Sequence, residues 1–419
     1  MSIYNVLFSC GAAALVAATL TAATESPKSS VTYTKDVAPI LFANCAGCHR
    51  AGEIAPMSLL NYKETRPWAK SIKQAVATHT MPPWLADPAY GHFSNDRRLA
   101  QSDVDKIVKW VDAGAPEGNL ADMPPTPKFV DGWVLGKPDV VIEMPTAFEV
   151  PAEGVIPYKY VTAKTNFTED KWIRGVEIRA GNRAVVHHII LSVREPGATK
   201  APEANTEVAA DVRRGRNVQL AGTAPGLQPV MYRDGVAKLI KAGSEIVFQL
   251  HYTPNGKATT DKSYVGLYFA SEPAREIART AGIMNVSFKI PPGEPNHEVR
   301  STWTAKEDIL LRGFMPHMHV RGKDFKYTVV YPDGKSEILL NVPRYDFNWQ
   351  LGYTLADPLP LPKGTRIDCV AHFDNSVNNK FNPDPAKEVR WGDQTFEEMM
   401  IGWFDYTPVA KDAKLQSSL

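Results

Sequence analysis

The sequence predicts a multidomain protein in which a small all-α domain is followed by a long all-β region. The chain has 419 residues, which is more than one small domain needs. Apolar residues recur with helical spacing before Leu120. From Tyr158 onward, short runs rich in β-branched and aromatic residues alternate with turn residues. These two patterns predict helices first and strands afterwards.

Composition limits the classes of function. Hydrophobic residues make up 44% of the chain and charged residues 22%, as in a globular protein with a substantial core. The formal net charge is only +1, which argues against nucleic acid or an acidic membrane surface as a partner.

The N-terminus predicts export. Residues 6–23 are apolar and rich in small residues, so we expect a signal peptide over residues 1–23 that is cleaved after Ala23 and takes Cys10 with it. No Lys or Arg precedes the apolar run, which departs from the usual pattern. An uncleaved N-terminal membrane anchor is therefore the alternative.

The most informative motif is Cys45-Ala46-Gly47-Cys48-His49. A Cys-x-x-Cys-His run is typical of the attachment site of a c-type haem (heme c), in which the two thiols bind the vinyl groups and the histidine binds the iron. A redox pair and half a zinc site are the alternatives. They are weaker because no βαβ pattern surrounds the motif and Cys10 and Cys369 are each single. Covalent haem is attached outside the cytoplasm, so the motif and the predicted signal peptide together predict a periplasmic protein.

The haem iron needs a second axial ligand. Met81 is the first choice, because the two prolines that follow it stiffen its loop and a thioether ligand raises the reduction potential. Met57 and His79 are the alternatives, and a purely structural role in the core is the other interpretation of Met81.

Two helices are expected around this motif. Thr34–Asn44 leads into it, and the capping-box pattern at Ser102–Asp105 opens a second helix that Gly114 ends. Helices on both sides of such a motif are typical of a small cytochrome c, so we expect a cytochrome c-like haem domain over residues 31–119. The proline-rich residues 120–151 are predicted to be a linker that forms a strap over the next domain.

The rest of the chain is predicted to be one or two β-sandwiches. Pro254-Asn255-Gly256 and Pro332-Asp333-Gly334 are typical of hairpin turns. The predicted strands are Tyr158–Val161, Val185–Val193, Glu245–Tyr252, Tyr264–Ala270, Asp308–Phe314, Phe325–Tyr331 and Met399–Tyr406.

Five of the ten histidines lie on these apolar strands or at their ends: His187, His188, His251, His317 and His319. Alternate residues of a strand share a face, so the last two can bind one ion. The adjacent pair can do so only if the strand bulges. As core residues, all five would need their own hydrogen-bond partners, so metal binding is favoured. The remaining candidates, treated as structural or surface residues, are His79, His92, His297 and His372.

The ordered set of motifs resembles the copper type II, ascorbate-dependent monooxygenases, the group of peptidylglycine α-hydroxylating monooxygenase and dopamine β-monooxygenase. A His-His pair, a His-Tyr before a turn, a His-x-His and a late Glu-Glu-Met follow one another between Lys159 and Tyr406. The resemblance implies two tandem jelly-roll domains, which we expect at residues 152–275 and 276–410, with one copper ion each.

The resemblance also implies the ligands. The first copper would be bound by His187, His188 and His251. The second copper, which binds oxygen, would be bound by His317, His319 and Met399, with Met400 as an alternative. Imidazole suits copper and a thioether favours Cu(I), so the residue types agree with this chemistry.

This sequence departs from the family in two respects. Cys369 has no partner for a disulfide and is predicted to be a buried thiol, whereas the animal enzymes are rich in disulfides. The haem motif is also absent from the animal enzymes. In this respect the chain resembles a bacterial group in which a cytochrome c domain precedes a monooxygenase-like domain.

We therefore expect a periplasmic haem–copper oxidoreductase that uses O₂ to hydroxylate a C–H bond of a small-molecule or peptide-like organic substrate. Electrons from a periplasmic donor would pass through the c-type haem to two copper ions. The first alternative is a haem and copper electron-transfer protein without hydroxylase activity. A second alternative is a haem-bearing binding module whose sandwiches hold no metal. Arg321 and Lys323 are candidates to contact an anionic substrate, although charged residues after a strand are usually solvated.

Overall fold

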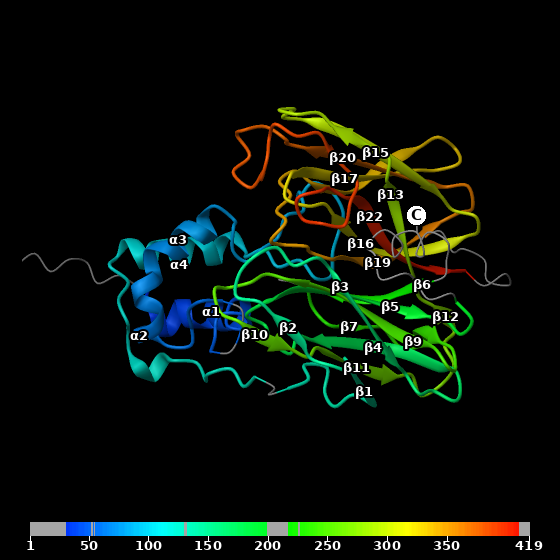
Figure 1. Cartoon of the computed structure of the whole chain (residues 1–419). Helices are drawn as coiled ribbons and strands as arrows, with labels where there is room; N and C mark the ends of the chain where they lie inside the picture. Colours follow the sequence, from blue (N-terminus) through cyan, green and yellow to red (C-terminus); the bar gives the residue numbers. More distant parts are fainter. Residues whose placement is uncertain are drawn as a thin grey trace, which may run out of the picture.

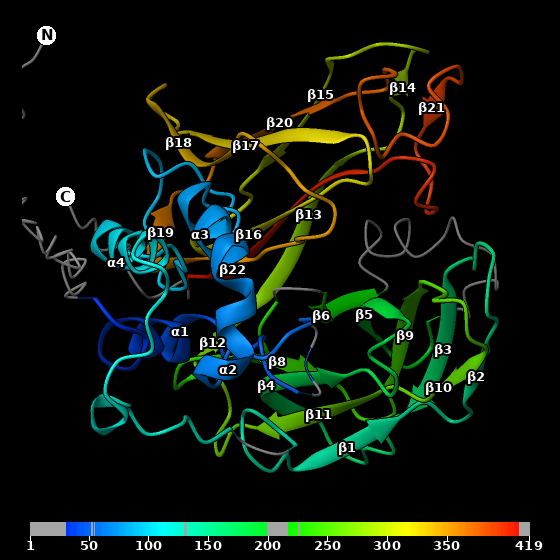
Figure 2. The same cartoon turned by 90° about the vertical axis from the view of Figure 1, so that its left-hand side faces the viewer.

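The computed structural model describes residues 31–51, 53, 55–129, 132–198, 217–224 and 227–409. It shows a mainly β protein with a few helices at the N-terminal end, arranged as a helical region beside two stacked β-sandwiches (Figures 1 and 2). This confirms the predicted predominance of β-sandwiches. The predicted signal peptide and Cys10 lie outside the described residues. Within them, no helix is both long and apolar enough to cross a membrane.

The helical region has a core of its own. Tyr33 and Trp110 are fully buried in it, with their ring centroids 6.0 Å apart. Cys45 directly follows the helix that leads into the Cys-x-x-Cys-His motif, as predicted. The helices are η1 (Tyr33–Val37), α1 (Ala38–Asn44), α2 (Tyr62–Thr65), η2 (Arg66–Trp68), α3 (Ala69–Ala77), α4 (Gln101–Asp112) and η3 (Leu120–Asp122).

The predicted capping box at Ser102 is wrong. Helix α4 begins one residue earlier, at Gln101, so Ser102 lies inside the first turn and Ala100 occupies the N-cap without a side-chain hydrogen bond. The end of α4 is as predicted, because Gly114 has a φ of +87°, which favours glycine and terminates the helix.

The first sandwich packs two sheets around a core in which Ile173, Phe248 and Leu250 are fully buried. One sheet has the order β1 (Val140–Glu143), β11 (Tyr264–Phe269), β4 (Lys171–Arg179), β8 (Val236–Ile240), β12 (Glu276–Ile277), with β7 (Val230–Met231) beside β4. The other has the order β3 (Lys159–Lys164), β9 (Glu245–Tyr252), β5 (Val186–Arg194), β6 (Asn217–Thr223). The short strands β2 (Phe148–Val150) and β10 (Thr259–Asp261) pair with each other.

The second sandwich is built the same way around Phe325, Tyr327 and Phe373, which are fully buried. One sheet has the order β13 (Arg279–Asn285), β22 (Met400–Pro408), β16 (Ile309–His317), β19 (Tyr353–Leu361). The other has the order β15 (His297–Thr304), β20 (Arg366–Phe373), β17 (Gly322–Val330), β18 (Ser336–Val342). The short strands β14 (Lys289–Ile290) and β21 (Val389–Arg390) also pair. Cys369 is a fully buried free thiol, as predicted.

Of the two predicted hairpins, only the second is present. β17 and β18 are joined by the turn at Pro332-Asp333-Gly334, where the amide of Tyr331 donates to the carbonyl oxygen of Lys335 at 2.8 Å. After Pro254-Asn255-Gly256 the chain does not return along β9. Instead β10 pairs with β2, because β9 already has β3 and β5 on its two edges.

The predicted linker over residues 120–151 is wrong in its second half. β1 and β2 lie within it, and β1 adds to the edge of a sheet of the first sandwich by pairing with β11. Backbone pairing therefore shows that the first sandwich begins at Val140 and not at residue 152, as was predicted. The boundary predicted at residue 276 also shifts, because β12 (Glu276–Ile277) pairs with β8 of the first sandwich.

A segment of the N-terminal region leaves the helices and joins the second sandwich. Trp84 is buried in the core of that sandwich, and its ring centroid lies 4.9 Å from that of Tyr353. Phe93 forms an isolated β-bridge with Leu355. The expected cytochrome domain over residues 31–119 is thus interrupted by a stretch that belongs to the core of another unit.

The two sandwiches contact each other through polar groups. Lys238 is buried, and its Nζ donates to the carbonyl oxygens of Gln219 and Leu220, at 2.8 and 2.9 Å, and to Thr280 Oγ1 of β13 at 2.9 Å. Arg312 of β16 pairs with Glu276 of β12. These contacts hold the two units in a fixed relation at the interface where the histidines lie.

Candidate metal centres at the sandwich interface

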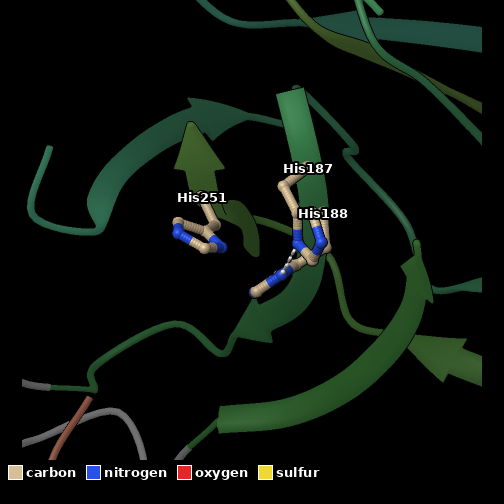
Figure 3. A group of neighbouring side chains, drawn as sticks. All are labelled: His187, His188 and His251. Atoms are coloured by element: carbon tan, nitrogen blue, oxygen red, sulfur yellow. Dashed lines mark hydrogen bonds between the residues drawn. The ribbon is translucent and has the colours of Figure 1, made fainter. Parts of the chain in front are cut away.

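Three histidines converge on adjacent strands of the first sandwich. His187 and His188 lie on β5 and His251 lies on β9 (Figure 3). The register of these strands shifts between Val186 and His188, so that His188 pairs directly with His251 and His187 occupies a bulge. The bulge lets adjacent side chains reach one site, as the sequence argument required.

The coordinating nitrogens of this trio lie within 4.8 Å of one another. The Nδ1 atoms of His187 and His188 are 3.2 Å apart. His251 Nε2 is hydrogen-bonded with Thr395 Oγ1 at 3.3 Å, while its Nδ1 is buried and has no partner among the described residues. An unpartnered buried nitrogen is costly unless a ligand binds it. Three imidazoles at this spacing could hold one metal ion.

Burial keeps these imidazoles neutral. It lowers the pKa of His251 to about 3 and holds the pKa of His188 well below its usual value, and the neighbouring histidines add to both effects. The pKa of His187 is lowered by burial alone. Because a metal binds the neutral form of imidazole, all three side chains are in the ligating form at neutral pH.

The other two histidines lie where β16 ends. His317 is the last residue of the strand, and Met318 between the two histidines is fully buried in the core of the second sandwich. His317 Nδ1 is hydrogen-bonded with Gln350 Oε1 at 2.8 Å, and His319 Nδ1 with the carbonyl oxygen of Glu397 at 3.1 Å. These bonds leave the Nε2 atoms available, and His319 Nε2 is buried without a partner among the described residues.

The position of Met399 favours it over Met400 as the thioether ligand. Met400 is fully buried inside the second sandwich. Met399 packs instead with Ile401 and Trp403 in a separate cluster. His317 pairs with Ile401 across the strands, and side chains two residues apart share a face. Met399 and His317 therefore lie on one face, while Met400 lies on the other.

The buried side chain of Glu398 fixes the backbone beside His319. The Glu398 carboxylate accepts hydrogen bonds from the amides of His319, at 2.8 Å, and Arg321, at 2.6 Å. Burial raises the pKa of Glu398 to about 8, and these hydrogen bonds act in the opposite direction. Arg321 is 1% exposed and donates to Asn375 Oδ1 and the carbonyl oxygen of Phe396. Its predicted roles, as a substrate contact or a solvated residue, are both wrong. It is a structural residue.

The two groups of histidines are neighbours across the interface. Phe347 stacks on His187 with ring centroids 5.2 Å apart and an interplanar angle of 11°. The same ring lies 6.0 Å from His319. The ring centroids of His187 and His319 are thus at most about 11 Å apart, because both distances are measured from the ring of Phe347.

The loop before β22 contacts both groups. Thr395 reaches His251, and Glu397 holds His319. Tyr160 of β3 donates to Asp393 at 3.3 Å. The sequence does not indicate these roles of Phe347 and Thr395, because a single aromatic or hydroxyl residue in a loop carries no spacing signal. Glu397 and Glu398 could have been found, since they precede Met399 directly.

The remaining candidate histidines contribute to neither group. His372 Nδ1 is hydrogen-bonded with Asp324 at 2.7 Å, and Glu298 lies on its other side. His79 and His92 are exposed, and His297 begins β15. Lys323 donates to Asn296 Oδ1 on the surface, in agreement with a solvated role.

The Cys-x-x-Cys-His motif follows α1. Both thiols are free, as attachment of a haem requires. Burial and the neighbouring Cys48 raise the pKa of Cys45 to about 12, whereas a redox-active thiol pair needs a lowered pKa. Burial lowers the pKa of His49, and a hydrogen bond with the backbone of Met57 opposes this shift. The raised pKa of Cys45 argues against a redox-active thiol pair at this position.

A cavity of about 630 Å³ lies between the two sandwiches and the segment that carries Trp84. Met315 and Trp403, which pack in the Met399 cluster, line one side of it. Leu220 and Leu227 line another side, and Arg97 adds a positive charge. A cavity of this size suits a small organic molecule or a short peptide segment.

Comparison with known proteins gives little further information. No protein-family model matches the chain, and no characterised protein is found as a relative. Among solved structures, the chain is similar to the major capsid protein P2 of bacteriophage PM2, with a TM-score of 0.30 and 10% identity over 66% of this chain and 99% of that one. For PNGF-II the TM-score is 0.28, with 8% identity over 64% of this chain and 65% of that one. These scores are too low to carry an argument.

Proposed function

We propose that this chain is a haem–copper oxidoreductase, and specifically an O₂-dependent monooxygenase that hydroxylates a C–H bond of an organic substrate. The observation that carries the proposal is the group of five half-buried or buried, neutral histidines at the interface of the two sandwiches. Three of them have their nitrogens within 4.8 Å, and buried nitrogens of His251 and His319 have no partner among the described residues.

The donor atoms fit two different copper ions. The Nδ1 atoms of His187, His188 and His251 would hold one ion. The Nε2 atoms of His317 and His319 with the sulfur of Met399 would hold the other, for which the soft thioether favours Cu(I). The second ion would supply O₂ activation. The protein's own residues orient these ligands through Gln350, Glu397 and Thr395.

The cavity beside Met315 gives the substrate a place to bind. Met315 and Trp403 belong both to its lining and to the Met399 cluster. A C–H bond of a substrate bound there would therefore lie near the second site. The lining is mixed: Leu220, Leu227 and Met315 could contact an apolar part of the substrate, and Arg97 offers a charge for a polar end. This cavity favours hydroxylation over electron transfer alone.

Electrons would arrive through a c-type haem held in a cytochrome c-like helical region by Cys45, Cys48 and His49. Met81 would supply the second protein ligand of the iron, because the two prolines that follow it stiffen its loop, and Met57 and His79 are the alternatives. We place the protein in the periplasm, where c-type haem is attached.

The first test is the metal content of protein exported from a host that matures c-type haem. We expect one haem and two copper ions per chain, and reductant-dependent O₂ uptake that rises with a suitable substrate. Haem with two copper ions but no O₂ uptake under any substrate would support the electron-transfer alternative. Haem without copper, even after loading with Cu(I), would overturn the proposal.

A further inference from the structure

A very short connection joins the proposed haem ligand Met81 to the second sandwich. Met81 is followed by Pro82 and Pro83, and the next residue, Trp84, is buried in the core of that sandwich. In Figure 1 the blue segment after α3 runs from the helical region into the second sandwich. Three residues of chain span at most about 11 Å. The position of Trp84 therefore limits the position of Met81.

This connection is also stiff. A proline ring fixes its own φ, and a proline restricts the residue before it to extended conformations. Pro82 and Pro83 form no hydrogen bond with any other residue that the structure describes. The two rings are thus what holds the connection straight, and a displacement of Trp84 is passed on to Met81.

On its other side Met81 follows the end of α3. Its amide donates to the carbonyl oxygen of Ala75 at 3.2 Å, and the amide of Thr80 donates to the same oxygen at 2.9 Å. His79 turns the chain here with a φ of +54°, in the left-handed region that favours glycine. These bonds hold the backbone up to Met81. They do not fix the direction of the chain beyond it, which depends on the sandwich.

The sandwich holds its end of the connection at several points. The Trp84 ring lies 4.9 Å from the ring of Tyr353 on β19. The amide of Asp87 donates to the carbonyl oxygen of Asn341 on β18 at 2.8 Å, and the side-chain amide of Asn341 donates to Asp87 Oδ2 at 3.1 Å. Residues 84–95 thus form a docked segment that is fixed to β18 and β19.

The indole of Trp84 is not the best choice for packing alone. Its Nε1 is buried and has no hydrogen-bond partner among the described residues. A buried donor without a partner lowers stability, so an apolar ring would suit this core position at least as well. Trp84→Phe is therefore a conservative variant that keeps an aromatic anchor in place.

We propose that the second sandwich, through Trp84, positions the Met81 thioether as the second protein ligand of the haem iron. Trp84 is a positioning residue, because it acts only through Met81. This inference rests on the proposed function. A thioether ligand raises the reduction potential of the iron, so the potential depends on the docked segment of residues 84–95. Binding of the sulfur to the iron transfers neither an electron nor a proton.

The test identifies the ligand of the ferric haem in the exported holoprotein. A thioether bound to ferric haem gives a weak far-red absorption band and raises the midpoint potential. We expect the wild-type protein and Met57→Leu to show this band and Met81→Leu to lose it. Covalent haem without the band in the wild-type protein would overturn the inference and leave the proposed haem site standing. A wild-type protein without covalent haem would overturn the proposed function, so the two failures are distinguishable.

The decisive variant carries two additional glycines between Pro83 and Trp84. The core of the second sandwich keeps all its residues, whereas the connection to Met81 becomes longer and flexible. We expect the far-red band to fall to less than half of its wild-type intensity and the midpoint potential to decrease. Hydrogen exchange of the β19 amides should stay at the wild-type level. An unchanged band and potential would overturn the inference.

Substitutions at Trp84 separate positioning from the presence of a particular side chain. Trp84→Ala should lose the far-red band, and Trp84→Phe should retain it together with the wild-type potential. If Trp84→Ala does not fold, the insertion variant decides the question, because it leaves Trp84 in place. A wild-type band in folded Trp84→Ala would contradict the positioning role.

The matched control loosens the helical region at a different contact. Arg183 of the first sandwich pairs with Glu53, which lies four residues after His49 of the haem motif. Arg183→Gln removes this tie and leaves the connection from Met81 to Trp84 intact, so its far-red band should keep the wild-type intensity. A loss as large as that in the insertion variant would show that general loosening decides the ligation, and would overturn the inference.

Discussion

At the scale of single residues, neighbours in the sequence have opposite roles here. Met399 and Met400 differ by one position, yet one packs beside the face of His317 and the other is buried in the core of the second sandwich. The alternation of side chains along a strand is responsible for this difference. It allows the ligand assignment to be tested with two matched substitutions.

Met399→Leu conserves volume and removes only the thioether. We expect the copper content to fall from two ions to one per haem and the copper–sulfur contribution to disappear from the X-ray absorption spectrum of the Cu(I) protein. Met400→Leu should retain both coppers and lower the free energy of unfolding by less than about 1.5 kcal/mol. Loss of the copper–sulfur signal in the Met400 variant alone would reverse the assignment.

The buried imidazoles also predict how the copper-free protein responds to acid. The pKa of His251 is about 3 and that of His317 about 4 in the folded protein, against about 6.5 in the unfolded chain. Between these values the unfolded chain binds protons that the folded protein does not, so stability falls as the pH decreases from about 6.5 to about 4.

We therefore expect the thermal midpoint of the copper-free protein to drop more steeply over this pH range than that of the His251→Gln/His317→Gln double variant. The carboxyl groups are common to both proteins and cancel in the comparison. Calorimetry at a series of pH values provides the measurement. Parallel curves for the two proteins would show that these histidines are already protonated when folded.

At the scale of elements, the segment around Trp84 is the main departure from the expected organisation. The side chain is 6% exposed in a sandwich whose strands begin about two hundred residues later, and it packs against Phe93 and Tyr353. Asn95 adds hydrogen bonds to the backbone of Gly352 and Thr354. This segment acts as a part of the second sandwich although it comes from the helical end of the chain.

Trp84→Ala should therefore destabilise the second sandwich by about 3–5 kcal/mol, the range observed for large aromatic truncations in cores. Trp68→Ala is the control, since Trp68 is 41% exposed and lies in the same N-terminal region. Hydrogen exchange of the β16 and β19 amides, read by mass spectrometry, should rise only in the Trp84 variant. An equal rise in the helices and no change in β16 would contradict this prediction.

There is a physical reason why some elements were predicted correctly from the sequence and others were missed. Strand β9 was predicted with its exact bounds, because Glu245–Tyr252 is rich in β-branched and aromatic residues and is bounded by turn residues. The bulge at His187 was a condition for the two adjacent imidazoles to share a site, and the sequence alone did not predict it. The pairing of β2 with β10 was missed, since a turn signal says nothing about which strand is free to accept a partner.

At the scale of the whole molecule, the two groups of histidines face each other across the interface of the two sandwiches. The first sandwich carries one group and the second sandwich carries the other. The sequence order indicated two groups but contained no information on their separation. That separation depends on long-range contacts such as Lys238 with Thr280, and on Phe347, which lies in a loop without any pattern. The same limit applied to the Glu53–Arg183 pair, whose partners are far apart in sequence.

The docking of residues 84–95 on the second sandwich has a consequence for the order of folding. During synthesis this segment emerges long before Asn341, Gly352 and Tyr353, which it contacts. Contacts between such distant parts of a chain form slowly, because a long loop must close first. The second sandwich thus completes its core only after the N-terminal segment has returned to it. Completion of this core is therefore a late folding step, because it needs segments from both ends of the described chain.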